Sequence, residues 1–116
     1  MVLLDVSVLV NAMRDAAPRH LVAKAYLEGL REAPEPFGLS ELVLAGALRV
    51  LTHPRVFVPP TPVASAMAFA DLLRDTPNAV LVAPGPRHWA IFRDLLSASG
   101  AIGNLVSDAW HAALAI

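Results

Sequence analysis

The sequence has 116 residues, of which 56% are hydrophobic and 16% are charged, and nine Lys and Arg residues against ten Asp and Glu residues give a net charge of −1. This composition supplies enough apolar material for a buried core, which excludes intrinsic disorder, and the balanced charge excludes a basic tail that binds nucleic acid. The absence of cysteine excludes disulfides, thiolate chemistry, zinc ribbons and iron–sulfur clusters.

The predicted elements begin with a short apolar run, Val2–Leu4, which is typical of a buried parallel strand. A turn near Asp5–Ser7 and a short helix are expected to follow it. Pro18 then begins a helix that runs to about Leu30, and the prolines of Ala33–Pro36 end it. The chain is therefore expected to open with one strand and two helices.

Capping and breaking residues mark the remaining predicted elements. Ser40, Thr61 and Asn104 are each predicted to cap the helix that follows them, and Gly100 is predicted to close a helix. The helix after Ser40 is apolar almost all round, which predicts that it is buried. The expected helices, together with a second buried strand at 80–82, are Leu42–Leu51, Val63–Arg74, Arg87–Ser99 and a last helix from about Leu105.

The order of strand, helices, strand and helices predicts an α/β layer fold with a small parallel sheet flanked by helices, in one domain over residues 1–116. The N-terminus lacks the basic leader of a signal peptide, and no apolar stretch is long enough to span a membrane, so we expect a cytoplasmic protein without membrane contact. The apolar end, Leu114–Ile116, carries no helix-stop signal, which favours a sequence that is cut short.

Three acids stand beside strongly apolar segments, where a carboxylate most needs a partner. Asp5 follows the first strand, at the sheet edge where α/β proteins bind ligands, although a plain helix cap is an equally open interpretation. Glu41 and Asp108 are expected in the first turns of their helices, where the helix dipole alone favours an acid. A divalent cation would partner all three acids, and ligation by oxygen suits Mg²⁺ or Mn²⁺.

Five segments carry a family resemblance: Leu3–Val10, Phe37–Leu44, Val50–Phe57, Pro84–Trp89 and Gly103–Ala109. In this order and spacing they resemble the PIN-domain ribonucleases, and most closely the VapC toxins of mycobacterial toxin–antitoxin pairs. The resemblance covers essentially the whole chain. Its most specific parts are Thr52–Phe57 and Gly85–Trp89, whereas the opening Asp5–Ser7 is weakly specific.

The resemblance implies a three-layer PIN-like fold whose C-terminal strand segment is missing here. It also implies a Mg²⁺-dependent endoribonuclease that hydrolyses phosphodiester bonds in a structured RNA such as tRNA or rRNA. Asp5, Glu41 and Asp108 would then be the catalytic acids and metal ligands, with Ser7 supporting them. A VapB-like antitoxin, the RNA substrate and a second copy of the chain in a homodimer are the implied partners.

The sequence departs from the family pattern in two places. Many PIN domains carry the second acid about one turn further into its helix, where this chain has Ala45 and Gly46, so Glu41 is the acid available. The family also continues beyond the last helix into a strand and a further acid, whereas this sequence stops at Ile116. Fewer carboxylates predict weaker metal binding and weaker activity.

Other residues and other functions give weaker signals. Arg55, Arg87 and His88 follow helix or turn breaks and are candidates for holding RNA phosphates; without the resemblance, surface solvation or carbonyl capping is the favoured interpretation. A phosphatase of the haloacid dehalogenase type would need a second Asp where Ser7 stands, and a nucleotide-binding fold would need a glycine-rich loop. The alternative that stays open is an inactive or weakened PIN-like domain that binds an antitoxin.

Overall fold

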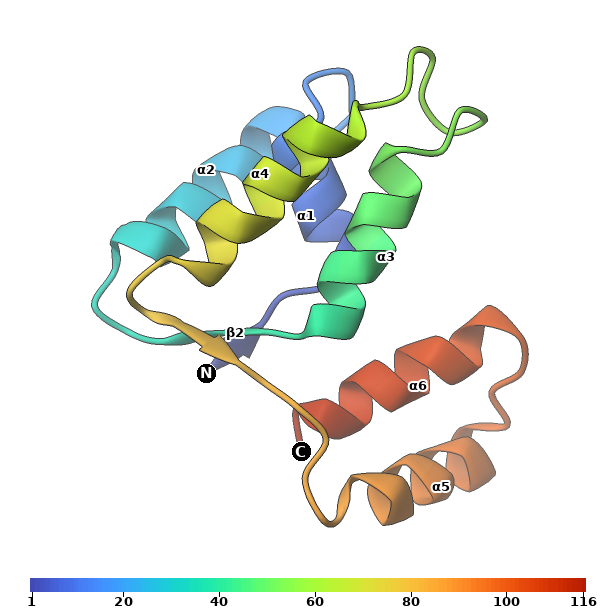
Figure 1. Cartoon of the computed structure of the whole chain (residues 1–116). Coiled ribbons are helices and arrows are strands. Elements are labelled where there is room, and N and C mark those ends of the chain that lie inside the picture. Colours follow the sequence, from blue (N-terminus) through green and yellow to red (C-terminus); the bar gives the residue numbers. More distant parts are fainter. The chain divides into compact units, whose positions relative to one another are not determined.

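Three short parallel strands form the sheet of this protein, in the spatial order β1, β2, β3 (Figure 1). The computed structural model describes all 116 residues and divides into two compact units, Met1–Leu81 and Val82–Ile116. The predicted α/β class with a small parallel sheet flanked by helices is confirmed. The elements of the first unit are β1 (Val2–Leu3), α1 (Val6–Met13), α2 (His20–Glu32), β2 (Phe37–Leu39), α3 (Glu41–Leu51), α4 (Val63–Arg74) and β3 (Ala79–Leu81).

The central strand, β2, is the element that the sequence prediction missed. All three of its residues are buried, and it pairs with β1 on one side and with β3 on the other. Its length of three residues, the proline just before it and Gly38 in its middle all argue locally against a strand. The pairing to two neighbours outweighs these local preferences, because each neighbour satisfies backbone groups that would otherwise be buried without a partner.

Asn78 is a second reason why β2 forms where it does. Its Nδ2 lies 2.7 Å from the carbonyl oxygen of Leu30 and 2.9 Å from those of Ala33 and Glu35, which ties the segment before β3 to the segment before β2. The backbone N–H of Phe37 donates to the Asn78 carbonyl over 3.1 Å. These contacts join residues far apart in the sequence, so no local pattern reports them.

The strand predicted as buried at 80–82 is present at Ala79–Leu81, but the prediction of burial was wrong. Val80 is 42% exposed and Leu81 is 46% exposed. β3 is paired to β2 alone, so its other edge has no strand beside it. Val2 in β1, the opposite edge strand, is also exposed, and full burial is therefore a property of the central strand only.

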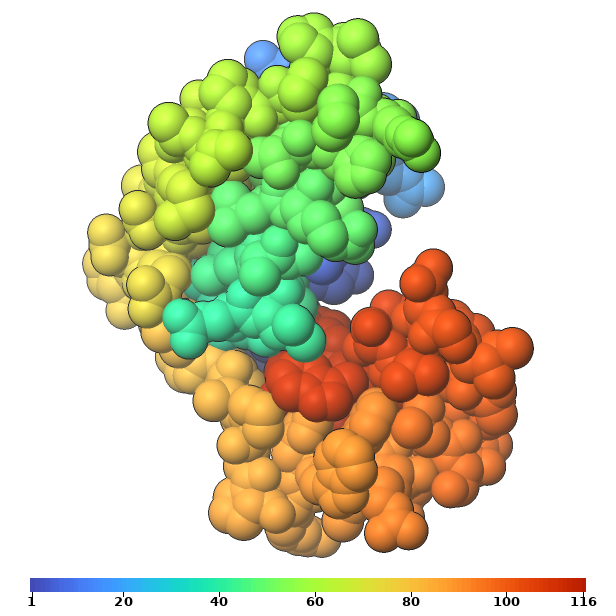
Figure 2. All heavy atoms as spheres, turned by 45° about the vertical axis from the view of Figure 1, so that its right-hand side comes forward, coloured from blue at the N-terminus to red at the C-terminus, as the bar shows by residue number.

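The core of the first unit lies between the helices and β2. Its apolar side chains come from every helix of the unit, and Figure 2 shows the atoms of α3 (green) meeting those of α4 (yellow-green) in one continuous surface. The composition of α3 predicted a helix that is buried on all sides. The prediction was wrong, because Leu42 of this helix is 52% exposed. The largest fully buried side chains are Phe37, Leu4, Leu9, Leu39, Leu51 and Leu73.

The loop between α3 and α4 is held by Arg14, at the end of α1. Its Nη2 donates to the Pro59 carbonyl over 2.7 Å and its Nη1 donates to Thr61 Oγ1 over 3.2 Å, while the guanidinium lies 4.7 Å from the centre of the Phe57 ring. Thr61 therefore accepts a hydrogen bond from Arg14. The prediction that Thr61 caps α4 was wrong, because the residue at the cap position is Pro62.

Two helical glycines differ in what surrounds them. A Cβ at Gly46 would lie 3.0 Å from Val6 Cγ2, so α1 and α3 approach each other closely here, whereas nothing lies within 4 Å of a Cβ at Gly29 in α2. Gly29→Ala is expected to raise the free energy of unfolding by roughly 0.5–1 kcal/mol, since alanine is the better helix former. Gly46→Ala is expected to give a smaller gain or a loss, because Val6 must move.

Chemical denaturation of the two glycine variants, side by side with the unmodified chain, measures this difference. Equal stabilisation by both substitutions would contradict the close approach of α1 and α3 at Gly46.

The second unit is a pair of helices, α5 (His88–Ser99) and α6 (Asn104–Leu114). Gly100 closes α5 in the left-handed conformation with φ 64°, which confirms its predicted role. Asn104 is the first residue of α6 and not its cap, because Gly103, with φ 58°, occupies the cap position. Across the structure, no helix has both the length and the apolar character that a membrane crossing requires.

Candidate functional site

Asp5 lies beyond the carboxyl end of β1 and directly precedes α1. Pairing continues one residue past β1, since the Leu4 N–H donates to the Gly38 carbonyl, and the chain then turns into the helix. The Asp5 Oδ1 accepts a hydrogen bond from the Val8 N–H over 3.0 Å, so Asp5 is the N-cap of α1. Asp5 is nevertheless exposed, and its Oδ2 makes no hydrogen bond or ion pair within the protein. One carboxylate oxygen is therefore open to an external ligand.

Glu41 begins α3 directly after the central strand. Leu3 of β1 pairs with Gly38 of β2, and Asp5 follows that pair by two residues while Glu41 follows it by three. Because both strands run parallel, both acids follow strand ends at the same edge of the sheet. The predicted first-turn position of Glu41 is confirmed.

The Glu41 carboxylate has one basic neighbour. Its Oε2 lies 3.7 Å from Arg74 Nη2, at the end of α4, and the two side chains are 72% and 44% exposed. An ion pair this long and this exposed contributes little to stability and is readily exchanged for another partner. No sequence pattern indicates this ion pair, because Glu41 and Arg74 belong to different helices that only the fold brings together.

Two serines stand close in sequence to the two acids, Ser7 after Asp5 and Ser40 before Glu41. Ser7 is exposed on α1, and its carbonyl oxygen accepts from Asn11 Nδ2 over 2.8 Å, but its hydroxyl makes no hydrogen bond to Asp5. Ser40 is 2% exposed and occupies the cap position of α3, yet its side chain makes no capping hydrogen bond. Ser40 thus occupies the predicted cap position, but the hydrogen bond expected from a capping side chain is absent.

Asp108 belongs to the second unit. It is the fifth residue of α6 and is exposed. The prediction that it lies in the first turn was wrong, because the helix begins at Asn104, and the attraction of the helix dipole is correspondingly weaker there. Within neither unit do three or more His, Asp or Glu side chains gather into a group that could hold a metal ion.

The candidates for phosphate contact lie in different settings. Arg55 is exposed in the loop between α3 and α4, where its backbone N–H donates to His53 Nδ1 over 3.1 Å. Arg87 is exposed just before α5, whereas His88, the first residue of that helix, is only 7% exposed. Arg87 and His88 both line a cavity of about 420 Å³ within the second unit, whose other walls are mainly apolar.

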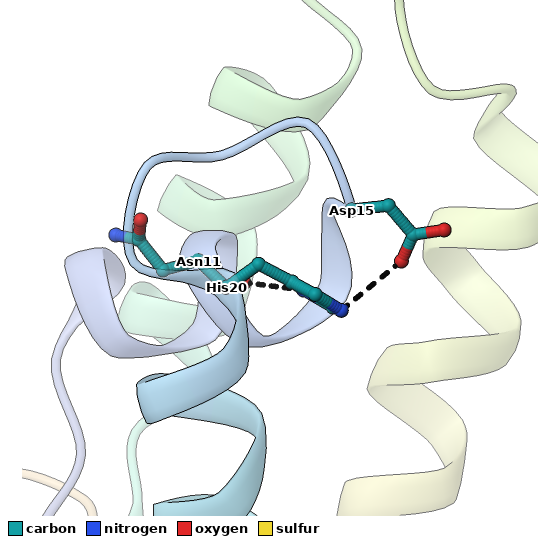
Figure 3. Close-up of polar contacts among 3 residues, drawn as sticks. All are labelled: Asn11, Asp15 and His20. Carbon is teal, nitrogen blue, oxygen red and sulfur yellow. Dashed lines mark hydrogen bonds and ion pairs between the residues drawn. The ribbon is translucent and has the colours of Figure 1, made fainter.

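One polar cluster, around His20, is not indicated by any pattern in the sequence. Figure 3 shows His20 between Asp15 and the backbone of Asn11: its Nε2 lies 3.1 Å from Asp15 Oδ1 and its Nδ1 lies 2.9 Å from the Asn11 carbonyl oxygen. The carbonyl only accepts, so Nδ1 donates there. Asn11 Oδ1 also accepts from the Arg19 N–H over 3.2 Å. With no nucleophile in it, the cluster fixes the connection between α1 and α2.

Comparison with known proteins gives a family match and several relatives. The model of the family described as "PIN domain" matches residues 2–116. Ribonuclease VapC43 of Mycobacterium tuberculosis (strain ATCC 25618 / H37Rv) is 43% identical over 116 residues, which are 100% of this chain and 79% of the relative. From the same strain, Ribonuclease VapC31 is 38% identical and Ribonuclease VapC25 is 37% identical, each over 100% of this chain and 82% of its own length.

Proposed function

The chain belongs to the PIN-domain family, and on that premise we propose that it is an endoribonuclease, the toxin of a toxin–antitoxin pair. The names of its relatives support ribonuclease activity. The observation that carries the proposal is the pair of carboxylates at one edge of the sheet, Asp5 after β1 and Glu41 after β2. RNA cleavage by hydrolysis is the chemistry that such an edge supports in this family.

The donor groups at this edge fit a divalent ion such as Mg²⁺ or Mn²⁺. Asp5 and Glu41 both offer carboxylate oxygen, which hard cations prefer. The Oδ2 of Asp5 is open while its Oδ1 caps α1. The neighbour that competes for Glu41 is Arg74, over a long and exposed contact that a divalent ion can displace. Asp108 is the third proposed ligand, from α6.

The roles of the chain's own residues follow from their chemistry. Asp5, Glu41 and Asp108 would hold the ion, and the Ser7 hydroxyl, exposed two residues after Asp5, would support the acids. A bound divalent ion supplies Lewis-acid polarisation of the phosphodiester and activates water for its hydrolysis. Arg55 and Arg87 are exposed guanidinium groups, which suit contacts to RNA phosphates.

The proposed substrate is a structured RNA, such as a tRNA or an rRNA, and the proposed partner is a small VapB-like antitoxin. We also propose a homodimer and a cytoplasmic site of action. Exposed apolar side chains on the first unit, among them Leu21 (80%) and Val22 (74%) of α2, supply surface for protein contacts.

The proposed activity is tested by incubating the purified chain with total tRNA and with rRNA, in Mg²⁺, in Mn²⁺ and in excess EDTA. Cleavage is expected with the metals, and EDTA is expected to reduce it by at least about 100-fold. Restoration by added Mg²⁺ is the control for damage by the chelator. Cleavage that persists in EDTA would overturn the metal-dependent mechanism.

A second candidate function is a weakened PIN-like domain that serves as an antitoxin-binding protein. One observation favours it: the first unit brings only two carboxylates to the sheet edge, and Glu41 is ion-paired there. The two functions differ in their dependence on Asp5, because a nuclease requires the acid, whereas a binding protein tolerates its replacement. Undetectable cleavage by the unmodified chain, together with antitoxin binding that an Asp5 variant leaves unchanged, would favour the second function.

A further inference from the structure

We propose that His88 is a positioning residue, which fixes the rotation of α6 and thereby the direction in which Asp108 points. The inference differs from the prediction that His88 holds RNA phosphate. It rests on the proposed function only for the part that Asp108 plays in RNA cleavage. The contact between His88 and α6 stands on the geometry of the second unit alone.

His88 is buried where its neighbours are not. It is 7% exposed, whereas Trp89, the next residue, is 63% exposed and Arg87 is also exposed. The imidazole Nε2 lies 2.9 Å from the backbone carbonyl oxygen of Trp110 in α6. Because a carbonyl oxygen only accepts, Nε2 carries a hydrogen and donates it. A phosphate could take this donor only after the contact to α6 had broken.

Two aromatic rings hold the imidazole in place. The Trp110 ring meets it at a centroid distance of 4.5 Å and an interplanar angle of 65°, an edge-on arrangement. Phe92, one turn further along α5, lies 6.3 Å away with an interplanar angle of 8°. Edge-on and offset aromatic contacts of this kind are favourable beyond the area that they bury. His88 is therefore fixed by one hydrogen bond and by packing on two sides.

The contact closes the open end of a helical hairpin. The short connection from Gly100 to Gly103 joins α5 and α6 at one end (Figure 1), and His88, the first residue of α5, reaches the later part of α6 at the other. The two helices pack against each other, but the connection itself attaches α6 at one end only. The hydrogen bond at Trp110 is a second attachment, which opposes rotation of α6 about its own axis.

The rotation of α6 decides where Asp108 points. Trp110 follows Asp108 by two residues, which corresponds to about 200° around a helix, so the two side chains leave α6 on nearly opposite sides. The structure agrees, since Trp110 packs on His88 while Asp108 is exposed. Holding Trp110 against α5 therefore directs the Asp108 carboxylate away from α5.

The test uses two variants in a Trp89→Phe background, in which Trp110 is the remaining tryptophan. His88→Phe keeps an aromatic ring and removes the donor, whereas His88→Gln keeps an N–H donor. The background protein is the control. Amide hydrogen exchange of α6 and the fluorescence of Trp110 report the helix without any reference to activity, and steady-state cleavage of RNA separates kcat from KM.

In His88→Phe we expect the α6 amides to exchange about tenfold faster and kcat to fall about tenfold, because one buried hydrogen bond is lost. KM for RNA is expected to change by less than about twofold, and His88→Gln is expected to restore most of both losses. A raised KM with unchanged kcat would identify a phosphate contact and overturn the proposal. Unchanged exchange in α6 would overturn it as well. An inactive parent chain would refute the proposed function, while hydrogen exchange would still decide the role of His88.

Discussion

The substitution Asp5→Asn is expected to lower RNA cleavage by at least about 100-fold while leaving the chain folded. Asparagine is as good an N-cap as aspartate, so its side-chain oxygen still accepts from the Val8 N–H that Asp5 Oδ1 now binds over 3.0 Å. What the substitution removes is the negative charge, and with it the electrostatic attraction for a divalent ion. The measurement is kcat/KM for RNA, with circular dichroism to establish the fold.

Asp5→Ala separates the negative charge of Asp5 from its role as helix cap, and a second variant serves as control. Asp5→Ala removes both, and is expected to lose about 1 kcal/mol of stability in addition to the activity. Asp71→Asn is the matched control, since it makes the same chemical change at an exposed acid of α4 that no proposal places in the site. Full activity in Asp5→Asn combined with a loss in Asp5→Ala would show that Asp5 serves only as a helix cap.

The largest expected effect on stability belongs to Phe37→Ala. Phe37 is 0% exposed in the central strand and is the largest of the fully buried side chains. Removing a buried phenyl group costs about 3–5 kcal/mol, which is a large share of the roughly 5–15 kcal/mol that stabilises a typical domain. Urea denaturation is expected to show this loss, or the variant is expected to be unfolded already in buffer.

Val58→Ala is the control for Phe37→Ala. Val58 is 85% exposed in the loop between α3 and α4, so its truncation is expected to change the free energy of unfolding by less than about 0.5 kcal/mol. Similar losses in the two variants would contradict the position of β2 at the centre of the sheet.

Local patterns predicted the elements whose signals are local. The helix Val63–Arg74 has its predicted bounds, and Gly100 ends α5 as its position indicated. Both signals act within a few residues, through a proline just before a helix and a glycine that adopts a positive φ. The fold class followed from the order of such elements and needed no distant contact.

The missed features depend on contacts between distant residues. β2 is specified by its pairing to two strands and by the carbonyl groups that Asn78 binds, and none of these partners is near Phe37–Leu39 in sequence. The ion pair of Glu41 with Arg74 has the same origin. For the proposed site, the pattern of a strand followed by an acid indicated Asp5 alone, because β2, the strand before Glu41, was missed. It carried no information on which groups the two carboxylates contact at the sheet edge.

The resemblance to a family indicated that His88 belongs to a characteristic segment, but a motif does not report burial. Only the structure shows that His88 faces Trp110 while Arg87, beside it, faces solvent. The first residues of a helix point in several directions, so neighbours in the sequence can have unrelated surroundings.

Asp5 and Glu41 are proposed to bind the divalent ion used in RNA hydrolysis. Calorimetric titration with Mg²⁺ tests this binding most directly. The full chain, Asp5→Asn, Glu41→Gln and the Asp71→Asn control are titrated under the same conditions. We predict saturable binding by the full chain and the control, and a loss of at least about tenfold in affinity in the other two variants. Equal affinity in all four proteins, or no binding by the full chain, would contradict the claim.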